Sequence, residues 1–157
     1  MLSKEDNLRL TRVGADSSMG KLLRKYWHPV AAVAELEDKP VKGVRLFGED
    51  LVLFRDKSGR YGLIDRRCPH RGFDLSYGTV EQNGLRCSYH GWRFCSGGRC
   101  LEQPFEDTVN PEARFKDKIS IKAYQVKARA GLLWVYMGPE PVPPLPMWEP
   151  FTWDRGF

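Results

Sequence analysis

Short apolar segments separated by turn residues run through most of the chain. Strand-forming residues gather in the segments Val30–Leu36, Val44–Phe47, Leu51–Asp56, Tyr61–Asp65, Leu85–Cys87, Trp92–Phe94, Cys100–Leu101, Ile119–Val126 and Leu132–Tyr136. Gly, Pro, Asp and Ser stand between them, and many short strands with closely spaced turns are typical of an antiparallel β-sandwich. We therefore expect an all-β fold, with a hairpin formed by the last two segments.

The first part of the chain follows a different pattern. Residues 1–14 are polar, and we expect them to lie over the surface. Apolar residues then recur with the i, i+3, i+4, i+7 spacing of one helix face, at Met19, Leu22, Leu23 and Tyr26. Pro29 forces an extended exit. Residues 1–28 are thus predicted to form an arm and one short N-terminal helix in front of the β domain.

The composition changes again after Tyr136. Six prolines fall close together among aromatic residues, at positions 139, 141, 143, 144, 146 and 150. Proline-rich segments of this kind are semi-rigid and extended. We place a domain boundary here, with one domain over residues 1–138 and a lead-out segment over residues 139–157.

Charge and composition restrict the class of protein. The chain of 157 residues fits one domain that can bury a core without disulfides. Its formal charge of +5 is mildly basic, but no Lys/Arg block with interleaved aromatics indicates nucleic-acid binding. No apolar run approaches the ~20 residues that span a bilayer, and the N-terminus lacks the apolar core of a signal peptide. We expect a cytoplasmic protein that does not enter membranes.

Cysteine and histidine stand close together twice in the middle of the chain. One residue separates Cys68 from His70, two separate Cys87 from His90, and sixteen residues lie between the pairs. Two thiolates and two imidazoles make a complete ligand set for an iron–sulfur cluster or for zinc. We expect metal-binding loops within residues 66–92, each of which delivers one thiolate and one imidazole.

Residues beside these ligands suit tight turns around a buried cofactor. Pro69 fixes its own φ and restricts the residue before it. Gly72 and Gly91 follow the two histidines and supply backbone freedom where chain and cofactor approach closely. Loop amides could then donate hydrogen bonds to the sulfurs of the centre.

The pattern Cys-x-His, about sixteen residues, Cys-x-x-His resembles the Rieske signature. The contexts Cys68-Pro-His-Arg-Gly and His90-Gly-Trp resemble the Rieske non-haem iron oxygenases, and the stretches Leu8–Gly14 and Met19–Val30 resemble their phthalate-dioxygenase-like subunits. The resemblance covers nearly the whole chain. It implies a Rieske-type β-sandwich with a small cluster-binding subdomain, and a [2Fe–2S] cluster with the cysteines on the buried iron and the histidines on the outer iron.

The resemblance also implies one-electron transfer within an aromatic-ring-hydroxylating oxygenase. A reductase or ferredoxin would donate the electron, and a mononuclear iron held by two His and a carboxylate in a catalytic domain or subunit would accept it. The chain has three His, so only His28 remains beside the cluster ligands and the second iron site cannot be built here. The segment 139–157 would lead toward an absent catalytic domain. The complete oxygenase would form a ring-like oligomer, for which a homotrimer is one candidate.

Three residues beside the ligands have expected roles in this interpretation. Arg71 and Tyr89 flank the outward histidines and could orient an electron partner. Trp92 is expected to pack against the cluster loops. His28, far from the other ligands in sequence, is expected to pack or to form a hydrogen bond.

The two remaining cysteines flank the Gly97-Gly98 turn. Respiratory-type Rieske proteins join their cluster loops by a disulfide, but in this chain Tyr89 and the Gly72-Phe73 pair occupy the corresponding positions. We therefore expect Cys95 and Cys100 to be small packed thiols, and the centre to resemble the lower-potential oxygenase type.

Two alternatives remain open from the sequence. One is a free-standing Rieske-type ferredoxin that shuttles electrons to another oxygenase. The other is a structural zinc module, although zinc modules usually pair Cys-x₂₋₄-Cys with His-x₃₋₅-His, unlike the mixed pairs found here. Metal and sulfide analysis separates zinc from iron, and a separate catalytic chain separates a carrier from an oxygenase domain.

Overall fold

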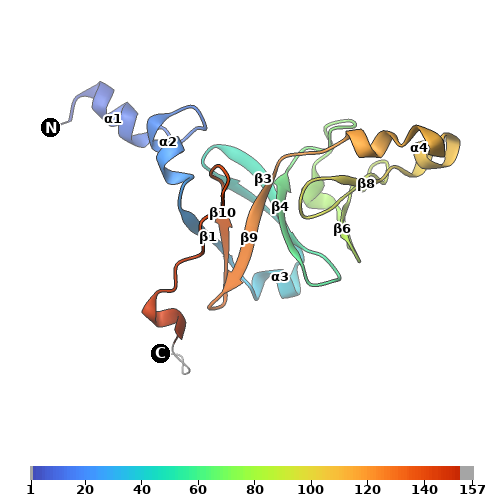
Figure 1. The fold of residues 1–157 in the computed structure, drawn as a ribbon. Helices are drawn as coiled ribbons and strands as arrows, with labels where there is room; N and C mark the ends of the chain where they lie inside the picture. Colours follow the sequence, from blue (N-terminus) through green and yellow to red (C-terminus); the bar gives the residue numbers. More distant parts are fainter. Residues whose placement is uncertain (1, 153–157) are drawn as a thin grey trace.

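The computed structural model describes residues 2–152 and contains two antiparallel sheets with short helices around them (Figure 1). The larger sheet has six strands in the order β1-β10-β9-β4-β3-β2. Their bounds are Trp27–Ala32 (β1), Val41–Leu46 (β2), Glu49–Arg55 (β3), Tyr61–Asp65 (β4), Ala123–Arg129 (β9) and Leu132–Tyr136 (β10). Every pairing is antiparallel, which confirms the predicted all-β class.

A smaller four-stranded sheet forms a subdomain at the end of the molecule away from both termini (Figure 1). Its order is β5-β6-β7-β8, and its strands are Thr79–Glu81 (β5), Gly84–Arg86 (β6), Arg93–Phe94 (β7) and Cys100–Glu102 (β8). All its pairings are antiparallel. This subdomain carries both predicted metal-binding loops.

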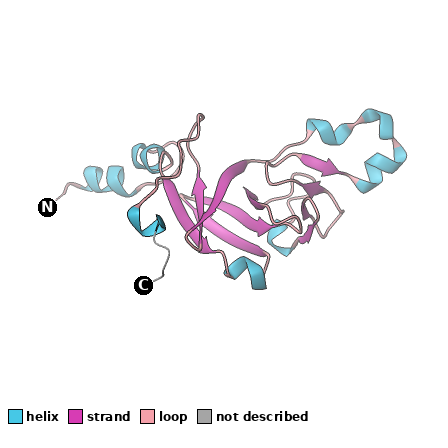
Figure 2. Ribbon diagram, turned by 60° about the horizontal axis from the view of Figure 1, so that its bottom comes forward, coloured by secondary structure: helices cyan, strands magenta, loops and turns pink. Residues whose placement is uncertain are grey.

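The helices lie at the periphery of the strands (Figure 2). The α-helices are Lys4–Thr11 (α1), Ser18–Leu23 (α2), Glu35–Asp38 (α3) and Pro104–Val109 (α4). The 3₁₀ turns are Leu75–Tyr77 (η1), Pro111–Ala113 (η2), Phe115–Lys118 (η3) and Glu149–Thr152 (η4). Across residues 2–152, none of these helices has the length and apolar character needed to cross a membrane.

Strand β3 shows why the two sheets share a core. Successive side chains of a strand point to opposite faces. Leu51 and Leu53 pack into one apolar cluster with the β1-β10 side of the large sheet, while Val52 and Phe54 pack into a second cluster. That second cluster also contains Cys68, Cys87 and Trp92, so the core of the large sheet supports the predicted metal-binding loops from below.

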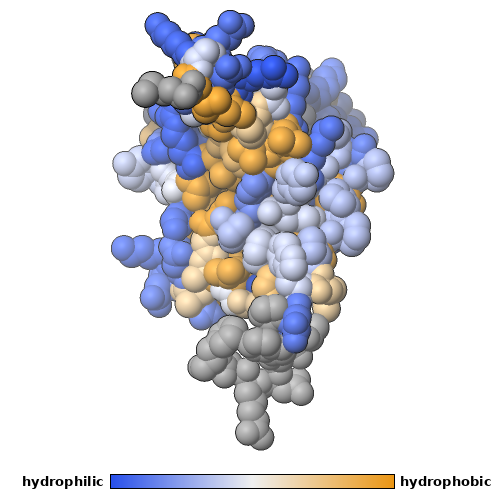
Figure 3. All heavy atoms as spheres, turned by 90° about the vertical axis from the view of Figure 1, so that its left-hand side faces the viewer, coloured by the Kyte–Doolittle hydropathy of each residue, from blue (hydrophilic) through white to orange (hydrophobic). Residues whose placement is uncertain are grey.

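The N-terminal region contains two helices, so the prediction of one short helix was wrong. Ser3 accepts a hydrogen bond from the Asp6 amide at 3.0 Å, and this cap starts α1 inside the supposed irregular arm. Helix α2 ends at Leu23, before Tyr26, the last residue of the predicted apolar face, and Trp27 begins β1. Helix α1 buries no residue, and Figure 3 shows apolar side chains gathered on the face of the molecule that carries these helices.

Arg24 fastens the N-terminal helices to the large sheet. Its buried guanidinium donates to the Val13 carbonyl at 2.8 Å and to the Phe47 carbonyl at 3.0 Å, and it pairs with Glu49 at 2.8 Å. Glu49 also accepts from Tyr124 at 2.7 Å. Burial and the hydrogen bond to Glu49 raise the pKa of Tyr124 above its ordinary value, so this hydroxyl stays protonated and remains a donor.

Other boundaries differ from the prediction by a few residues. The expected strand Val30–Leu36 is not continuous, because β1 ends at Ala32 and α3 begins at Glu35. Strand β9 begins at Ala123, later than the predicted start at Ile119. The segment from α4 to η3 was not predicted at all. By contrast, β4 and β10 have the predicted bounds.

The described part of the proline-rich segment packs back on the large sheet. Leu145 is buried in a third cluster with Trp27, Trp134 and Tyr136, and the Trp27 indole donates to the Pro143 carbonyl at 3.0 Å. The segment is therefore fixed against β1 and β10. Its last part, residues 153–157, lies outside the described residues.

Candidate metal centre

Two loops at the small subdomain repeat one backbone pattern. In each loop the cysteine amide donates to the carbonyl five residues later, from Cys68 to Phe73 at 2.9 Å and from Cys87 to Trp92 at 2.8 Å. In each loop the amide of the glycine four residues after the cysteine donates back to the cysteine carbonyl, at 2.8 Å and 3.0 Å. Both glycines have positive φ, +69° for Gly72 and +77° for Gly91. The predicted paired turns are thus present.

The two cysteines meet at the buried base of these loops. Cys68 and Cys87 are each 2% exposed, and their thiols are close enough to hydrogen-bond. Burial raises the pKa of Cys68 to about 11, and the neighbouring Cys87 adds to the shift. The amides of His70 and Arg71 oppose it by hydrogen-bonding to the Cys68 sulfur. A thiol in this environment ionises when a metal cation supplies the compensating charge.

The two histidines lie together on the outer side of the same loops. The ring centroids of His70 and His90 are 4.5 Å apart at an interplanar angle of 64°. His70 is half-buried and stacks on the Trp92 indole at 4.7 Å and 5°, whereas His90 is exposed and contacts the Tyr89 ring at 3.8 Å. The structure therefore pairs residues of the same type: the two thiols lie together at the buried base, and the two imidazoles lie together on the outer side.

The donor set fits a cofactor with two metal positions. His70 Nδ1 is buried and has no hydrogen-bond partner in the structure, although buried polar atoms are nearly always paired. A metal ion would satisfy it. Across residues 2–152, no three His, Cys, Asp or Glu side chains are grouped as around a single metal ion. Two thiols and two imidazoles are the donor set of a cluster with one pair of ligands on each iron.

The flanking residues named from the sequence surround this centre in different ways. Arg71 and Tyr89 are exposed beside the histidines, with Tyr89 58% exposed. Trp92 is 5% exposed and packs between His70 and Phe115, whose ring centroid lies 6.4 Å away. The packing role predicted for Trp92 is confirmed.

The residues outside the centre also have the predicted structural roles. The His28 ring lies 2.7 Å from the Leu23 carbonyl and meets the Phe47 ring edge-on at 4.7 Å. Cys95 and Cys100 are free thiols, and Cys100 is buried beside the core. Burial raises the pKa of Cys100 to about 11, so it stays a neutral packed thiol.

Sequence reasoning missed the charged residues that hold the loops. Arg67 and Arg86 each directly precede a cysteine, and their guanidiniums donate to the carbonyls of Gly72 at 3.3 Å and Gly91 at 2.6 Å. The repeated order of Arg, Cys, then Gly four residues after Cys was available in the sequence as a signal. The contact between each arginine and the glycine carbonyl becomes apparent only in the folded loops, where the turn brings the two residues together.

The comparisons with known proteins agree with this geometry. Residues 26–124 match the Rieske [2Fe-2S] domain family, and this range holds both loops and all four candidate ligands. The chain belongs to the Rieske [2Fe–2S] domain family. A cluster of this type is the cofactor that the family implies, and it favours iron over the zinc alternative.

Its relatives are Rieske oxygenase components. The chain is 61% identical over its full length to the 5,5'-dehydrodivanillate O-demethylase oxygenase subunit of a Sphingobium species, of which it covers 37%. It is 42% identical over 96% of its length to the phthalate 4,5-dioxygenase oxygenase subunit of Pseudomonas putida, covering 35% of that protein. The structure of NdmA from Pseudomonas putida with caffeine aligns with a TM-score of 0.64 at 35% identity, over 73% of this chain and 33% of that one. This Rieske domain thus spans about a third of the length of these relatives.

Proposed function

We propose that this chain is the electron-transfer domain of an aromatic-ring-hydroxylating oxygenase. Cys68, Cys87, His70 and His90 would hold its [2Fe–2S] cluster, with the two thiolates as one pair of ligands and the two imidazoles as the other. One observation carries this proposal: a buried thiol pair lies beneath an outer imidazole pair whose His70 Nδ1 is buried without a partner. The chain itself is not proposed to hydroxylate a substrate.

A bound Rieske cluster supplies reversible one-electron redox chemistry. The residues of the chain determine where that chemistry takes place. The core around Cys68 and Cys87 excludes water, and the amides of His70 and Arg71 direct hydrogen bonds at the Cys68 sulfur. Such bonds help to set the potential of an iron–sulfur centre. The exposed His90 is the proposed exit toward an electron acceptor.

The proposed partners follow from the family. A reductase or ferredoxin donates the electron, and the mononuclear iron of a catalytic domain or subunit accepts it. Arg71, which follows His70, and Tyr89, which precedes His90, are both exposed and orient the partner. The relatives named as oxygenase subunits support this assignment. We also propose a cytoplasmic location and a homotrimer in the complete oxygenase.

Ligand exchange tests the assignment of His90. His90→Cys is expected to keep a [2Fe–2S] cluster and to lower its potential, because a thiolate donates more charge than an imidazole. His28→Cys is the matched control, since His28 lies outside the metal centre and should leave the potential unchanged. Visible absorption, with iron, sulfide and zinc assays, establishes cluster content, and a redox titration gives the potential.

An unchanged potential in His90→Cys would contradict the ligand assignment. Stoichiometric zinc without sulfide, in protein purified without air, would contradict the electron-transfer function as a whole. Turnover of an aromatic substrate by this chain with reductant and O₂ alone would contradict the claim that catalysis needs a second iron site elsewhere.

A further inference from the structure

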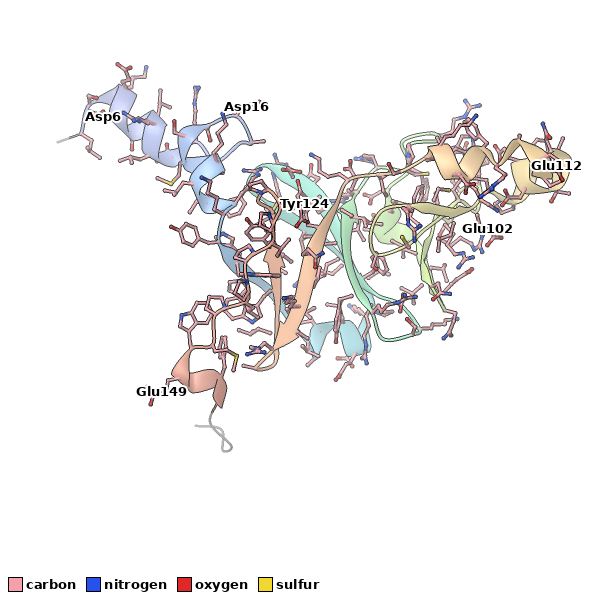
Figure 4. All side chains as sticks on the ribbon, in the orientation of Figure 1. Asp6, Asp16, Glu102, Glu112, Tyr124 and Glu149 are labelled. Carbon is pink, nitrogen blue, oxygen red and sulfur yellow. The ribbon has the colours of Figure 1, made fainter. Side chains whose placement is uncertain are left out.

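Four charged side chains form a network across the small sheet. Glu81, Arg86, Arg93 and Glu102 come one each from β5, β6, β7 and β8, and we call them the Arg–Glu bracket. Arg86 Nη2 lies 2.8 Å from Glu102, and Arg93 Nη2 lies 3.1 Å from the same carboxylate. Figure 4 labels Glu102 in this subdomain, away from Tyr124 on the large sheet.

Arg86 is the member of the bracket that reaches the metal-binding loop. Its guanidinium contacts Glu81 through two nitrogens, Glu102 through one, and the Gly91 carbonyl at 2.6 Å. A planar guanidinium presents five donors in a fixed fork. The carboxylates of Glu81 and Glu102 hold the Arg86 guanidinium in the orientation in which it reaches the Gly91 carbonyl.

Gly91 follows His90 directly, so the position of its peptide determines where His90 stands. Its amide donates to Cys87 and its carbonyl accepts from Arg86, which fixes the residue on both sides. The His90 ring itself is exposed and contacts the rings of His70 and Tyr89. Because these ring contacts leave His90 exposed, the hydrogen-bonded backbone beside it contributes to holding this histidine in place.

We infer that Arg86 is the positioning residue for His90, and that through the Gly91 carbonyl it sets the potential of the cluster. This inference rests on the proposed function. Reduction adds one electron, and a cation hydrogen-bonded to the loop favours the more negative reduced form. The Arg–Glu bracket holds that cation in place and cancels the repulsion between Arg86 and Arg93.

The test compares Arg86 with Arg67 in the whole chain carrying its cluster. At the wild-type midpoint potential, Arg86→Gln is expected to lower the ratio of reduced to oxidised cluster about ten-fold, the equivalent of one charged hydrogen bond. Arg86→Lys keeps the charge but loses the fork, and should still lower the ratio about three-fold. Arg67→Gln removes an equal charge before the other cysteine, and its effect should be about two-fold or less because Arg67 is exposed.

A second, milder variant guards against misfolding. Glu102→Gln leaves Arg86 in place but removes one of the two carboxylates that orient it. Loss of this negative charge by itself favours the reduced cluster, so the looser positioning of Arg86 is read from broadened electron paramagnetic resonance lines instead of from the ratio. A wild-type ratio in Arg86→Lys or wild-type line widths in Glu102→Gln would overturn the inference, as would equal shifts in Arg86→Gln and Arg67→Gln. A wild-type chain without iron and sulfide would overturn the proposed function itself, before any variant is compared.

Discussion

The two metal-binding loops have the same backbone hydrogen bonds, yet they hold their histidines differently. In the first loop His70 is half-buried and stacked on Trp92, and the arginine that contacts the loop is exposed. In the second loop His90 is exposed, and the arginine that contacts the loop is fixed by two carboxylates. His70 is thus stacked on a buried indole, whereas the exposed His90 has beside it a backbone carbonyl that a fixed arginine contacts.

This difference fits the division of work that we propose for the two ligands. In this proposal the half-buried His70, stacked on Trp92, would anchor the cluster. An exposed histidine can meet a partner, but it must then be held without covering its ring. The Arg–Glu bracket meets that requirement because it acts on the backbone, through the Gly91 carbonyl.

Loss of a cysteine ligand should have the largest effect. Cys87→Ser is expected to reduce iron and sulfide content to background, since a serine hydroxyl replaces a thiolate at the buried base of both loops. Cys95→Ser is the matched control, because Cys95 is a free thiol outside the centre. Iron and sulfide assays on both proteins check the prediction, and an unchanged iron content in Cys87→Ser would refute the role of this thiol.

An aromatic residue stands five positions after each cysteine, and replacing it with alanine should destabilise the protein by different amounts in the two loops. Trp92→Ala removes a buried indole and is expected to lower the free energy of unfolding by about 3–5 kcal/mol. Phe73→Ala removes a half-buried ring and should cost about 1–2 kcal/mol. Urea unfolding monitored by circular dichroism measures both. Equal losses would mean that the two loops are not packed differently.

Asp74 braces the first loop and makes its stability depend on pH. Arg66 hydrogen-bonds to this carboxylate at 2.8 Å and lowers its pKa from 3.8 to about 2. Because the folded pKa lies below the unfolded one, the stabilisation is complete above about pH 4 and is lost as the pH falls through about 2.

Asp74→Asn should therefore lower the free energy of unfolding at pH 7 by about 2 kcal/mol and flatten its dependence on pH between about 4 and 2. Asp117→Asn serves as the control, because Asp117 forms an exposed ion pair with Arg114 that is worth less than about 1 kcal/mol. Urea unfolding at several pH values measures the free energy of unfolding of both variants and of the wild type. The same acid dependence in Asp74→Asn as in wild type would show that another carboxyl is responsible.

The two glycines should show the smallest difference between the loops. Both have positive φ, so an alanine at either costs about 1–2 kcal/mol of backbone strain. A Cβ on Gly72 would meet no atom within 4 Å, whereas one on Gly91 would lie 3.0 Å from Pro104. Gly91→Ala should thus be the more destabilising variant in urea unfolding, and the reverse order would show that the second loop has room to move.

The sequence predicted the parts of the fold that depend on local patterns. Strands β4 and β10 have the predicted bounds because each is an apolar run between clear turn residues. Helix α1 was missed because it buries nothing and therefore has no apolar face to detect. Its local cap, Ser3 with Asp6 three residues later, was a usable signal.

The candidate ligand set could be proposed from the sequence for a similar reason, since each Cys and His pair lies within four residues of sequence. The Arg–Glu bracket could not, because its members come from four different strands and meet only through the order β5-β6-β7-β8. The stacking of His70 on Trp92 likewise joins residues from different loops. Spacing identifies ligands, whereas the residues that hold them depend on topology.

Low-temperature electron paramagnetic resonance of the reduced protein tests the central claim most directly. A cluster with two cysteines on the inner iron and two histidines on the outer iron should give a signal with a low average g value, with about two irons per chain and matching sulfide. A signal of the all-cysteine type, or no signal together with bound zinc, would contradict the assignment of His70 and His90 as ligands.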